Sequence, residues 1–416
     1  MVKQKKKIMI VAGEPSGDGH AAKLISAMHE LAPEIVFEFF GAVSHKLRAA
    51  DVEEIVNADD FSIVGLPEIA KALPMFWKAF QKLKRSAIER KPDAVILVDF
   101  PDFNLKLAKT LKKEGLKIIY YISPQLWAWR KYRASSIRKY VDLLLTILPF
   151  EKDWYAQQGI SHIEYVGNPT VREVHITMTK ESFCEKHNLD PAKPIVSLLA
   201  GSRHKEILRI LPVLLETAAL IVQKNADIQF VIALAATRKR AEVETAFEEA
   251  RNKGLKLPKI LITVQNETYE ALNASDAAAV TSGTATLETA IIGTPLAIVY
   301  KSSTLNYKLL RPLISVEHFG LINLIAEERL AKEMIQEDFT AELLAEEIFR
   351  LLEPATNQKM RDRLRDVTEK LGHGGASKRA AEFILQEFTK TGNGKITLRK
   401  LQVILHTKKK LLNLML

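Results

Sequence analysis

Short β-rich runs alternate with helical stretches along this 416-residue chain, and the alternation starts afresh near residue 193. The expected strands of the first series are Ile8–Ala12, Val36–Phe40, Ala94–Val98, Lys117–Tyr121, Leu143–Ile147 and His162–Tyr165. Those of the second series are Ile195–Leu199, Gln229–Ala233, Lys259–Thr263, Ala277–Val280 and Leu296–Tyr300. Helical stretches fit between most of them, as crossover connections between parallel strands require. The sequence therefore predicts an α/β protein with two doubly wound, Rossmann-like domains.

The loops with unusual chemistry all follow expected strands. They are residues 13–18, 99–104, 123–129, 201–205 and 282–284. In doubly wound sheets, ligands bind beyond the carboxyl ends of the strands. If the two sheets face each other, these loops line one shared cleft, and we expect the functional site there.

Composition and charge narrow the class of protein. A hydrophobic content of 47% and a charged content of 26% fit a soluble globular chain, whose length suggests two or three domains. The net charge of +10 gathers at the ends, residues 1–7 and 389–416, which carry no acid. A nearly neutral body argues against nucleic acid, whereas basic ends beside apolar residues fit an anionic membrane surface. The single cysteine, Cys184, excludes an intrachain disulfide.

The loop TSGTATLET, residues 281–289, predicts an anion site. Ser282, Gly283 and Thr284 lie between an expected strand and a helix, where unpaired N–H groups and the helix dipole favour a phosphate. Glu288 follows one turn later and is placed to accept hydrogen bonds from sugar hydroxyls. This combination suggests a nucleotide-sugar site, with an ordinary capped turn as the alternative.

The first loop, GEPSGDGH at residues 13–20, favours an uncharged ligand. Glu14 and Asp18 would repel a pyrophosphate, and Pro15 removes one N–H from any phosphate cradle. We therefore interpret the loop as an acceptor site for hydroxyl or amide groups rather than a dinucleotide site. A tight turn capped by a side chain remains the alternative.

Two further loops supply a candidate base and a candidate phosphate contact. Asp99 and Asp102, in VDFPDFN, could take a proton from an attacking hydroxyl, although Asp102 could equally cap a helix. Arg203, in GSRHKEI, can bind a phosphate through two nitrogens at the start of a helix.

Two stretches combine aromatic and basic residues. In SPQLWAWRKYR, residues 123–133, Trp127 and Trp129 either line a ligand groove or pack between the domains. In residues 66–85, Met75, Phe76 and Trp77 lie among lysines, which indicates either a membrane-surface segment or a buried amphipathic helix. No motif typical of metal ligation or of a nucleophile elbow is present.

Eight short motifs, taken together and in order, resemble the lipid-A-disaccharide synthases, which are inverting glycosyltransferases of the GT-B fold. The motifs are GEPSGD (13–18), PDFN (101–104), SPQLWAW (123–129), GSR with EI (201–207), TSGTATLE (281–288), NLIAEE (323–328), EMIQE (333–337) and GASKRAAEFIL (375–385). The resemblance runs from about Ile8 to Phe388. GNP at 167–169 departs from the GHP common in the family, which puts a donor-side role of that position in question.

This resemblance implies a reaction and a location. UDP-2,3-diacylglucosamine would donate its sugar to 2,3-diacylglucosamine 1-phosphate, giving UDP and a β-1,6-linked disaccharide 1-phosphate for lipopolysaccharide. It implies no cofactor and no metal, and a peripheral enzyme on the cytoplasmic face of the inner membrane. A homodimer is known in the family, and whether this chain forms one is left open.

The resemblance also assigns roles to individual residues. The donor-site contacts that it implies are Ser282, Gly283, Thr284, Glu288 and Asn323. Arg203 would stabilise the departing UDP, Asp102 would be the base with Asp99 in reserve, and the acceptor side would hold Glu14 and Ser16.

The expected organisation has four parts. Residues 1–170 form an acceptor and membrane-facing domain, and residues 171–370 form the UDP-sugar domain. A helix at 371–388 packs back towards the first domain, and residues 389–416 form a tail of unknown role. Two alternatives stay open: an enzyme like UDP-N-acetylglucosamine 2-epimerase, and a non-catalytic protein of the membrane surface.

Overall fold

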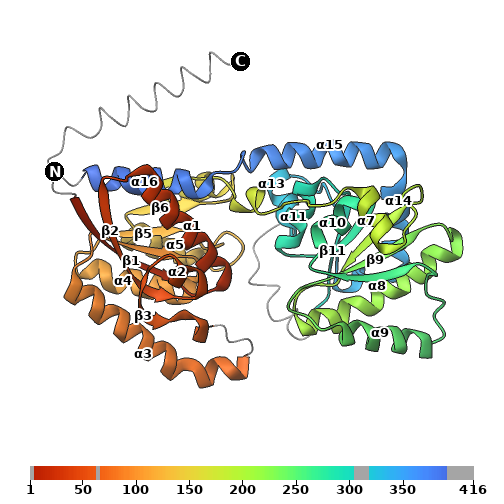
Figure 1. Ribbon diagram of the computed structural model, residues 1–416, viewed down its shortest axis with the longest axis horizontal. Coiled ribbons are helices and arrows are strands. Elements are labelled where there is room, and N and C mark those ends of the chain that lie inside the picture. The colour runs from red at the N-terminus through yellow and green to blue at the C-terminus, as the bar shows by residue number, and fades with distance from the viewer. Residues whose placement is uncertain (1–3, 62–65, 304–317, 391–416) are drawn as a thin grey trace, which may run out of the picture.

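Two parallel β-sheets organise the computed structural model, which describes residues 4–61, 66–303 and 318–390 (Figure 1). The first sheet has the strand order β3-β2-β1-β4-β5-β6-β7 and the second β10-β9-β8-β11-β12-β13. The strands of the first sheet are β1 (Gln4–Ala12), β2 (Ile35–Val43), β3 (Glu53–Asn57), β4 (Ala94–Val98), β5 (Ile118–Tyr121), β6 (Leu143–Thr146) and β7 (Ile163–Tyr165). Those of the second are β8 (Ile195–Leu199), β9 (Gln229–Leu234), β10 (Leu261–Gln265), β11 (Ala277–Thr281), β12 (Leu296–Tyr300) and β13 (Glu333–Ile335).

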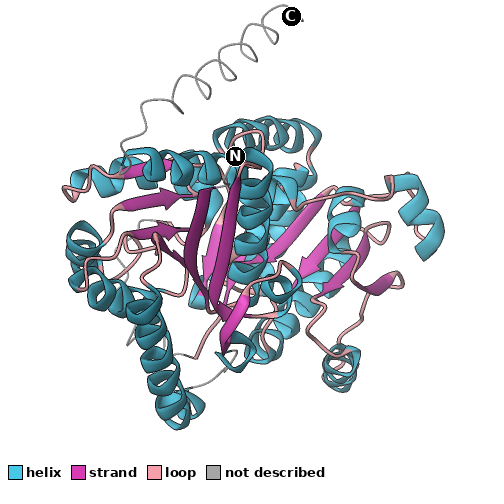
Figure 2. Cartoon of the chain, turned by 60° about the vertical axis from the view of Figure 1, so that its left-hand side comes forward, coloured by secondary structure: helices cyan, strands magenta, loops and turns pink. Residues whose placement is uncertain are grey.

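Helices connect the strands and cover both faces of each sheet (Figure 2). In the first half they are α1 (Pro15–Leu31), α2 (His45–Ala49), α3 (Leu66–Arg90), α4 (Pro101–Lys113), α5 (Ala134–Tyr140) and α6 (Glu151–Gln157), with the 3₁₀ helices η1 (Ala58–Phe61), η2 (Lys131–Arg133) and η3 (Pro169–Arg172). In the second they are α7 (Lys180–His187), α8 (His204–Lys224), α9 (Arg240–Asn252), α10 (Thr268–Ala274), α11 (Thr284–Ile292), α13 (Leu321–Ala326), η5 (Gln336–Asp338), α14 (Ala341–Leu352), α15 (Pro354–Lys370) and α16 (Ala376–Lys390).

The central strands of the first sheet are buried on both faces, as their continuous apolar runs predict. Along β1, Ile8 and Ile10 point into a core shared with α1, whereas Met9 and Val11 point into a core shared with α3, α4 and α5. This alternation follows from the two-residue period of a strand. The sheet therefore forms the middle layer of a three-layer domain.

The last helix does not belong to the half that precedes it in the sequence. Figure 1 shows α15 on the second half and α16 on the first, along one side of the molecule. Ala380, Ile384 and Phe388 of α16 are buried in the core that α1 shares with β1. The predicted domain boundaries at 170 and 370 stay predictions, and most of the predicted tail, residues 391–416, lies outside the described residues.

The fold class predicted from the sequence is confirmed, but two helices begin earlier than expected. The predicted loops 13–18 and 99–104 mostly form the first turns of α1 and α4, which begin at Pro15 and Pro101. Proline suits the first helical position because its fixed φ is helical and its missing N–H would have no partner there. The edge strands β3 and β13 were not predicted.

The strand order itself selects four loops. In each parallel sheet the direction in which successive strands are added reverses at one point, between β1 and β4 and between β8 and β11. Such a reversal separates the loops that follow the two strands and leaves room for a ligand. The four loops begin at Gly13, Asp99, Ala200 and Ser282, so the topology singles out four of the five loops that the sequence identified.

Candidate active site

The turn after β4 is held in an uncommon backbone conformation. Asp99 and Phe100 have φ angles of 48° and 52°, in the left-handed region that side chains disfavour. The backbone carbonyl of Asp99 accepts hydrogen bonds from Nδ2 of Asn104 at 2.8 Å and from the hydroxyl of Tyr120 at 2.7 Å. These two donors fix the turn and therefore the direction of the Asp99 side chain.

The carboxyl group of Asp99 has the electrostatics of a base for neutral pH. Burial and, to a smaller extent, the nearby charge of Glu14 raise its pKa to about 6, and the N–H of Phe100 partly opposes both effects. A general base is most effective when its pKa lies near the operating pH. Asp99 therefore fits the role better than an ordinary surface aspartate.

Asp102 has the opposite surroundings. Its side chain is 63% exposed. Its Oδ1 accepts hydrogen bonds from Nη1 of Arg130 at 2.9 Å and from Nη2 of Arg133 at 2.5 Å. Two guanidinium groups bond to this carboxylate and compete with a hydroxyl for its lone pairs. The geometry thus favours the reserve candidate, Asp99, over the first choice made from the sequence.

The loop after β1 lies against the same turn. A Cβ on Gly13 would meet the ring of Phe100 at 2.2 Å, so a larger residue there would displace Phe100. Glu14 precedes α1 and is exposed, as is Ser16 in its first turn. Asp18 is buried and accepts backbone N–H groups at the start of α2, including that of Lys46 at 2.7 Å. Asp18 is therefore structural, whereas Glu14 and Ser16 remain available to a ligand.

The aromatic loop after β5 divides into a buried part and an exposed part. Trp127 is buried and donates to Oε1 of Glu151 at 3.0 Å, while Ser123 donates to Oε2 at 2.8 Å. Complete burial raises the pKa of Glu151 to about 7. Trp129 is partly exposed, and the guanidinium of Arg130 stacks on its ring at 4.0 Å. Packing thus accounts for Trp127, and Trp129 is the one of the two that could meet a ligand.

The predicted anion loop has the expected form. Ser282 follows β11, Gly283 precedes α11 with a φ of 155°, and Thr284 begins the helix. Gly283 and Thr284 are exposed, so the start of this helix is open to solvent. Burial raises the pKa of Glu288, one turn further along, and the nearby Glu173 raises it further.

Arg203 immediately precedes α8. Its side chain is 74% exposed and touches only Glu206 among the described residues, with Nη1 3.2 Å from Oε1. Glu206 also accepts the backbone N–H groups of Ser202 and Arg203, at 3.0 and 3.1 Å. The guanidinium is therefore free to reach a ligand, but no contact brings it to Asp99 or Asp102 in the described part of the chain.

Asn323 is not placed to touch a ligand directly. It is fully buried and donates to Oε1 of Glu333 at 2.9 Å and to the carbonyl of Ala331 at 2.8 Å, while its Oδ1 accepts the N–H of Ala331. Glu333 in turn accepts the N–H of Phe319 at 2.9 Å, and the carbonyl of Phe319 accepts the hydroxyl of Ser282. Asn323 therefore acts through Glu333 on the position of Ser282, a connection the sequence did not indicate.

A carboxylate in the segment between the sheets lies near groups of both halves. Glu173 pairs with Lys23 of α1 at 2.7 Å and lies 3.4 Å from Nδ1 of His20. Burial lowers the pKa of His20, and Glu173 opposes that effect. Since Glu173 also acts on Glu288, the start of α1 and the start of α11 approach the same group. Sequence reasoning gave no role to Glu173, which lies outside the motifs, or to His20, although His20 is the last residue of the GEPSGDGH loop.

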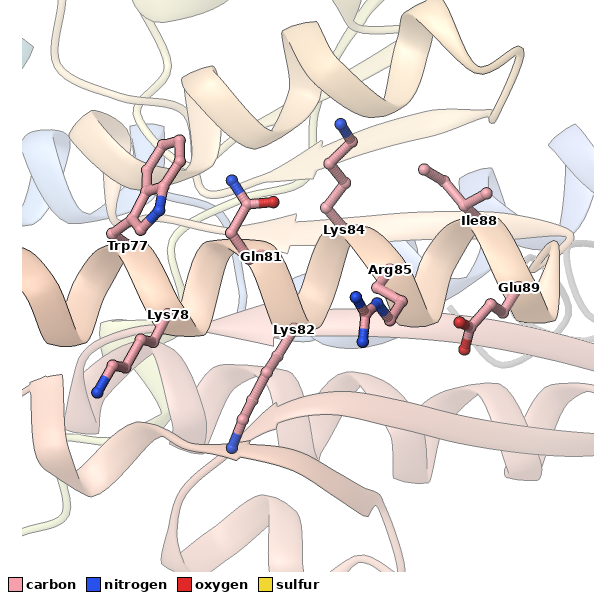
Figure 3. A pocket seen from close by; sticks show the side chains of 8 residues that line it. All are labelled: Trp77, Lys78, Gln81, Lys82, Lys84, Arg85, Ile88 and Glu89. Carbon is pink, nitrogen blue, oxygen red and sulfur yellow. The ribbon is translucent and has the colours of Figure 1, made fainter.

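The segment predicted to touch a membrane forms α3. A cavity of about 570 Å³ lies along it, away from the strand-end loops and lined by Trp77, Lys78, Gln81, Lys82, Lys84, Arg85, Ile88 and Glu89 (Figure 3). Trp77 is 63% exposed, whereas Met75 and Phe76 are partly buried against the first domain. Phe76 stacks on Phe61 with ring centroids 5.3 Å apart.

Comparison with known proteins identifies the family. Residues 8–388 match the family described as lipid-A-disaccharide synthetase. The chain belongs to the lipid-A-disaccharide synthase family. It is 42% identical over 381 residues to the lipid-A-disaccharide synthase of Trichlorobacter lovleyi, covering 91% of this chain and 97% of the relative. It is 40% identical to that of Myxococcus xanthus over 381 residues, covering 91% and 97%.

Solved structures show the fold that this lipid-A-disaccharide synthase family member shares with more distant proteins. A glycosyltransferase of Rickettsia africae superposes with a TM-score of 0.57 at 15% identity, over 94% of this chain and all of the other. The UDP-GlcNAc 2-epimerase of Neisseria meningitidis, solved with UDP-GlcNAc, gives 0.57 at 12% identity over 91% of this chain and all of the other. At these identities the likeness shows the GT-B architecture alone.

Two features are absent from the part of the chain that the structure describes. No cluster of three or more His, Cys, Asp or Glu side chains is arranged to hold a metal ion. None of the helices has the length and apolar character needed to span a bilayer.

Proposed function

We propose that this chain joins UDP-2,3-diacylglucosamine to 2,3-diacylglucosamine 1-phosphate. The products are UDP and a β-1,6-linked tetraacyl disaccharide 1-phosphate, a precursor of lipopolysaccharide. The observation that carries this proposal is the family match across residues 8–388, with relatives about 40% identical along almost their whole length.

The first-half loops supply the acceptor chemistry in this proposal. Asp99 takes the proton of the acceptor 6-hydroxyl while the oxygen attacks the anomeric carbon of the donor. The bond from that carbon to the phosphate oxygen breaks, and UDP leaves with the electron pair. The pKa of about 6 supports Asp99 as the base, because the group is mostly ionised at neutral pH yet still basic.

The second-half loops receive the departing UDP. The N–H groups at the start of α11 and the exposed guanidinium of Arg203 offer positive charge to its phosphates. Glu288 accepts sugar hydroxyls, and Asn323 keeps Ser282 in place through Glu333. Charge that develops on the leaving group is thus met by fixed donors, which is the usual source of electrostatic catalysis.

We further propose that the transfer needs no metal ion or other cofactor. The support is that an arginine and a helix start are already available to the phosphates, which is the role a divalent cation would otherwise fill. Turnover should stay unchanged after treatment with EDTA and removal of the chelator. Loss of turnover that added Mg²⁺ restores would overturn this part.

We propose peripheral attachment to the cytoplasmic face of the inner membrane through α3. Trp77 and Leu73 are 63% and 60% exposed on this helix, beside the exposed Lys78, Lys82 and Arg85. Each basic residue near an anionic bilayer contributes about 1 kcal/mol, and exposed aromatic groups can enter the interface. Both substrates are acylated, so their sugars lie at the same surface.

The deciding experiment is mass spectrometry of the products formed from both acylated substrates. We expect the tetraacyl disaccharide 1-phosphate together with an equal amount of UDP, and neither with one substrate omitted. The epimerase alternative predicts instead that unacylated UDP-N-acetylglucosamine changes when it is the only substrate. A non-catalytic membrane protein would bind vesicles and release no UDP. Either result would replace the proposal.

A further inference from the structure

The arginine pair at Asp102 is not used by the mechanism above. Arg130 and Arg133 each direct one guanidinium nitrogen to the same carboxylate oxygen, at 2.9 and 2.5 Å. Two guanidinium groups that share one acceptor atom must lie side by side. Asp102 neutralises only one of their two positive charges, so the cluster keeps a net charge of +1.

The cluster is built to hold its shape. Arg130 has a φ of 60° and precedes η2, and its guanidinium stacks on the Trp129 ring at 4.0 Å. The side chains of Arg130 and Arg133 are only 33% and 21% exposed, whereas Asp102 is 63% exposed. The arginines are therefore oriented before any ligand arrives, which reduces the entropy lost on binding.

The cluster follows closely in the chain on the turn that carries the proposed base. The hydroxyl of Tyr120 donates a hydrogen bond to the Asp99 carbonyl. Its pKa is affected by the charges of Asp99, Asp102 and Arg133. Asp99 ends β4, and Asp102 lies in the first turn of the helix that follows. A ligand whose hydroxyl reaches Asp99 would thus bring its other end within range of the two arginines.

We propose that Arg130 and Arg133 bind the phosphate monoester of the sugar acceptor. This inference rests on the proposed function, in which the acceptor carries a 1-phosphate. In a pyranose the 6-hydroxyl is carried on C5 through C6 and the 1-phosphate on C1, the two carbons that flank the ring oxygen, so the anion site must be near the base but separate from it. Each guanidinium has five N–H donors and uses one on Asp102, leaving enough for a dianionic phosphate.

The second half already offers other groups to the phosphates of UDP. Arg203 and the start of α11 belong to the second sheet, and the arginine pair belongs to the first. This separation favours the acceptor as the ligand of the pair. Asp102 then acts as a positioning residue, because it keeps both guanidinium groups together.

The test combines enzyme variants with two acceptors, diacylglucosamine 1-phosphate and diacylglucosamine, both with short chains in detergent. The variants are Arg130→Gln and Arg133→Gln, with Lys131→Gln as control, since Lys131 is exposed and the hydrogen bonds to Asp102 in the described structure come from the two arginines. We expect the wild type to prefer the phosphorylated acceptor in kcat/KM. Each arginine variant should reduce that preference roughly 10- to 100-fold through the acceptor KM, with the donor KM unchanged.

The possible outcomes distinguish failure of the phosphate site from failure of the proposed function. If an arginine variant slows both acceptors equally and leaves the preference intact, the phosphate site is overturned. If the wild type makes no disaccharide from either acceptor, the proposed function itself fails. Phosphates of a bilayer are the other source of the same chemistry. Reduced flotation of Arg133→Gln with anionic vesicles, at unchanged acceptor preference, would assign the pair to the membrane and overturn the inference.

Discussion

Two aspartates three positions apart in the chain have opposite chemistry. Asp99 is partly buried in a left-handed turn, and its pKa is raised to about 6 by burial and by Glu14. Asp102 is exposed and paired with two arginines. The motif alone placed both at the end of the same strand, but burial depends on the turn that Asn104 and Tyr120 stabilise. That turn has no signature in the sequence.

The first prediction distinguishes the two carboxylates. Asp99→Asn should lower kcat at least ~100-fold with little change in either KM, because it removes the proton acceptor and keeps the shape. Asp102→Asn should mainly raise the acceptor KM, because it loosens the arginine pair. Steady-state kinetics with each substrate varied would measure both. A large loss of kcat in Asp102→Asn, with Asp99→Asn nearly normal, would restore the original assignment of the base.

The second prediction concerns pH. A base must be ionised to act, so kcat/KM for the acceptor should fall about tenfold per pH unit below about 6 and stay level above it. The second ionisation of a phosphate monoester also lies near 6. The profile should therefore be repeated with the acceptor that lacks phosphate, where the acidic limb should remain. A level profile with that acceptor would assign the limb to the substrate and not to Asp99.

At the scale of elements, α3 has two faces with different tasks. Leu83 and Ala87 are buried in the first domain, and Phe76 stacks within its aromatic cluster. Trp77, Gln81, Lys84 and Ile88 lie along another side (Figure 3). The sequence grouped Met75, Phe76 and Trp77 as one membrane contact, but consecutive residues of a helix point about 100° apart. The exposed fractions single out Trp77 as the one that can reach a bilayer.

The third prediction follows from this division. Trp77→Ser should weaken flotation with vesicles of anionic lipid at least about threefold, with unfolding unchanged. Phe76→Ser should lower the free energy of unfolding by roughly 3 kcal/mol and leave flotation of the folded protein unchanged. Gln81→Ser, on the same exposed side as Trp77, is the matched control. Equal flotation of Trp77→Ser and the wild type would remove α3 from the membrane contact.

The strands that the sequence predicted correctly are more buried than the strands that it did not predict. Ala94–Val98, Ile195–Leu199 and Leu296–Tyr300 were predicted with the bounds observed, since each is a short apolar run that is nearly all buried. The edge strand Glu53–Asn57 has exposed or half-buried positions throughout, and Glu333–Ile335 has only three residues. Strands with one covered side carry a weak hydrophobic pattern.

At the scale of the whole molecule, the restart of the strand pattern was enough to predict two sheets. How the halves are tied together could not be predicted, because it depends on single contacts between distant residues. Glu173 pairs with Lys23 of α1 and lies close enough to Glu288 of α11 to raise the pKa of that carboxyl group. Arg379 of α16 donates to the carbonyl of Val166 at 2.8 Å, and Lys378 pairs with Glu30. The last helix thus connects the second half to the first.

The fourth prediction tests that connection over the length of the chain. Ile384 is completely buried in the core that α16 shares with α1, so Ile384→Ala should cost roughly 2–5 kcal/mol of unfolding free energy. Gln386→Ala, exposed on the same helix, should change it by less than about 0.5 kcal/mol. Hydrogen exchange should locate the effect in α1 and β1, and leave α8 and α14 protected.

That location has a consequence for catalysis, because α1 begins beside Glu14 and carries His20. Loosening the far end of the chain should therefore raise the KM of the acceptor more than that of the donor. If exchange in Ile384→Ala instead increased around α8 and α14, the last helix would be supporting the second half. The core of the first domain would then be stable without the contacts of α16.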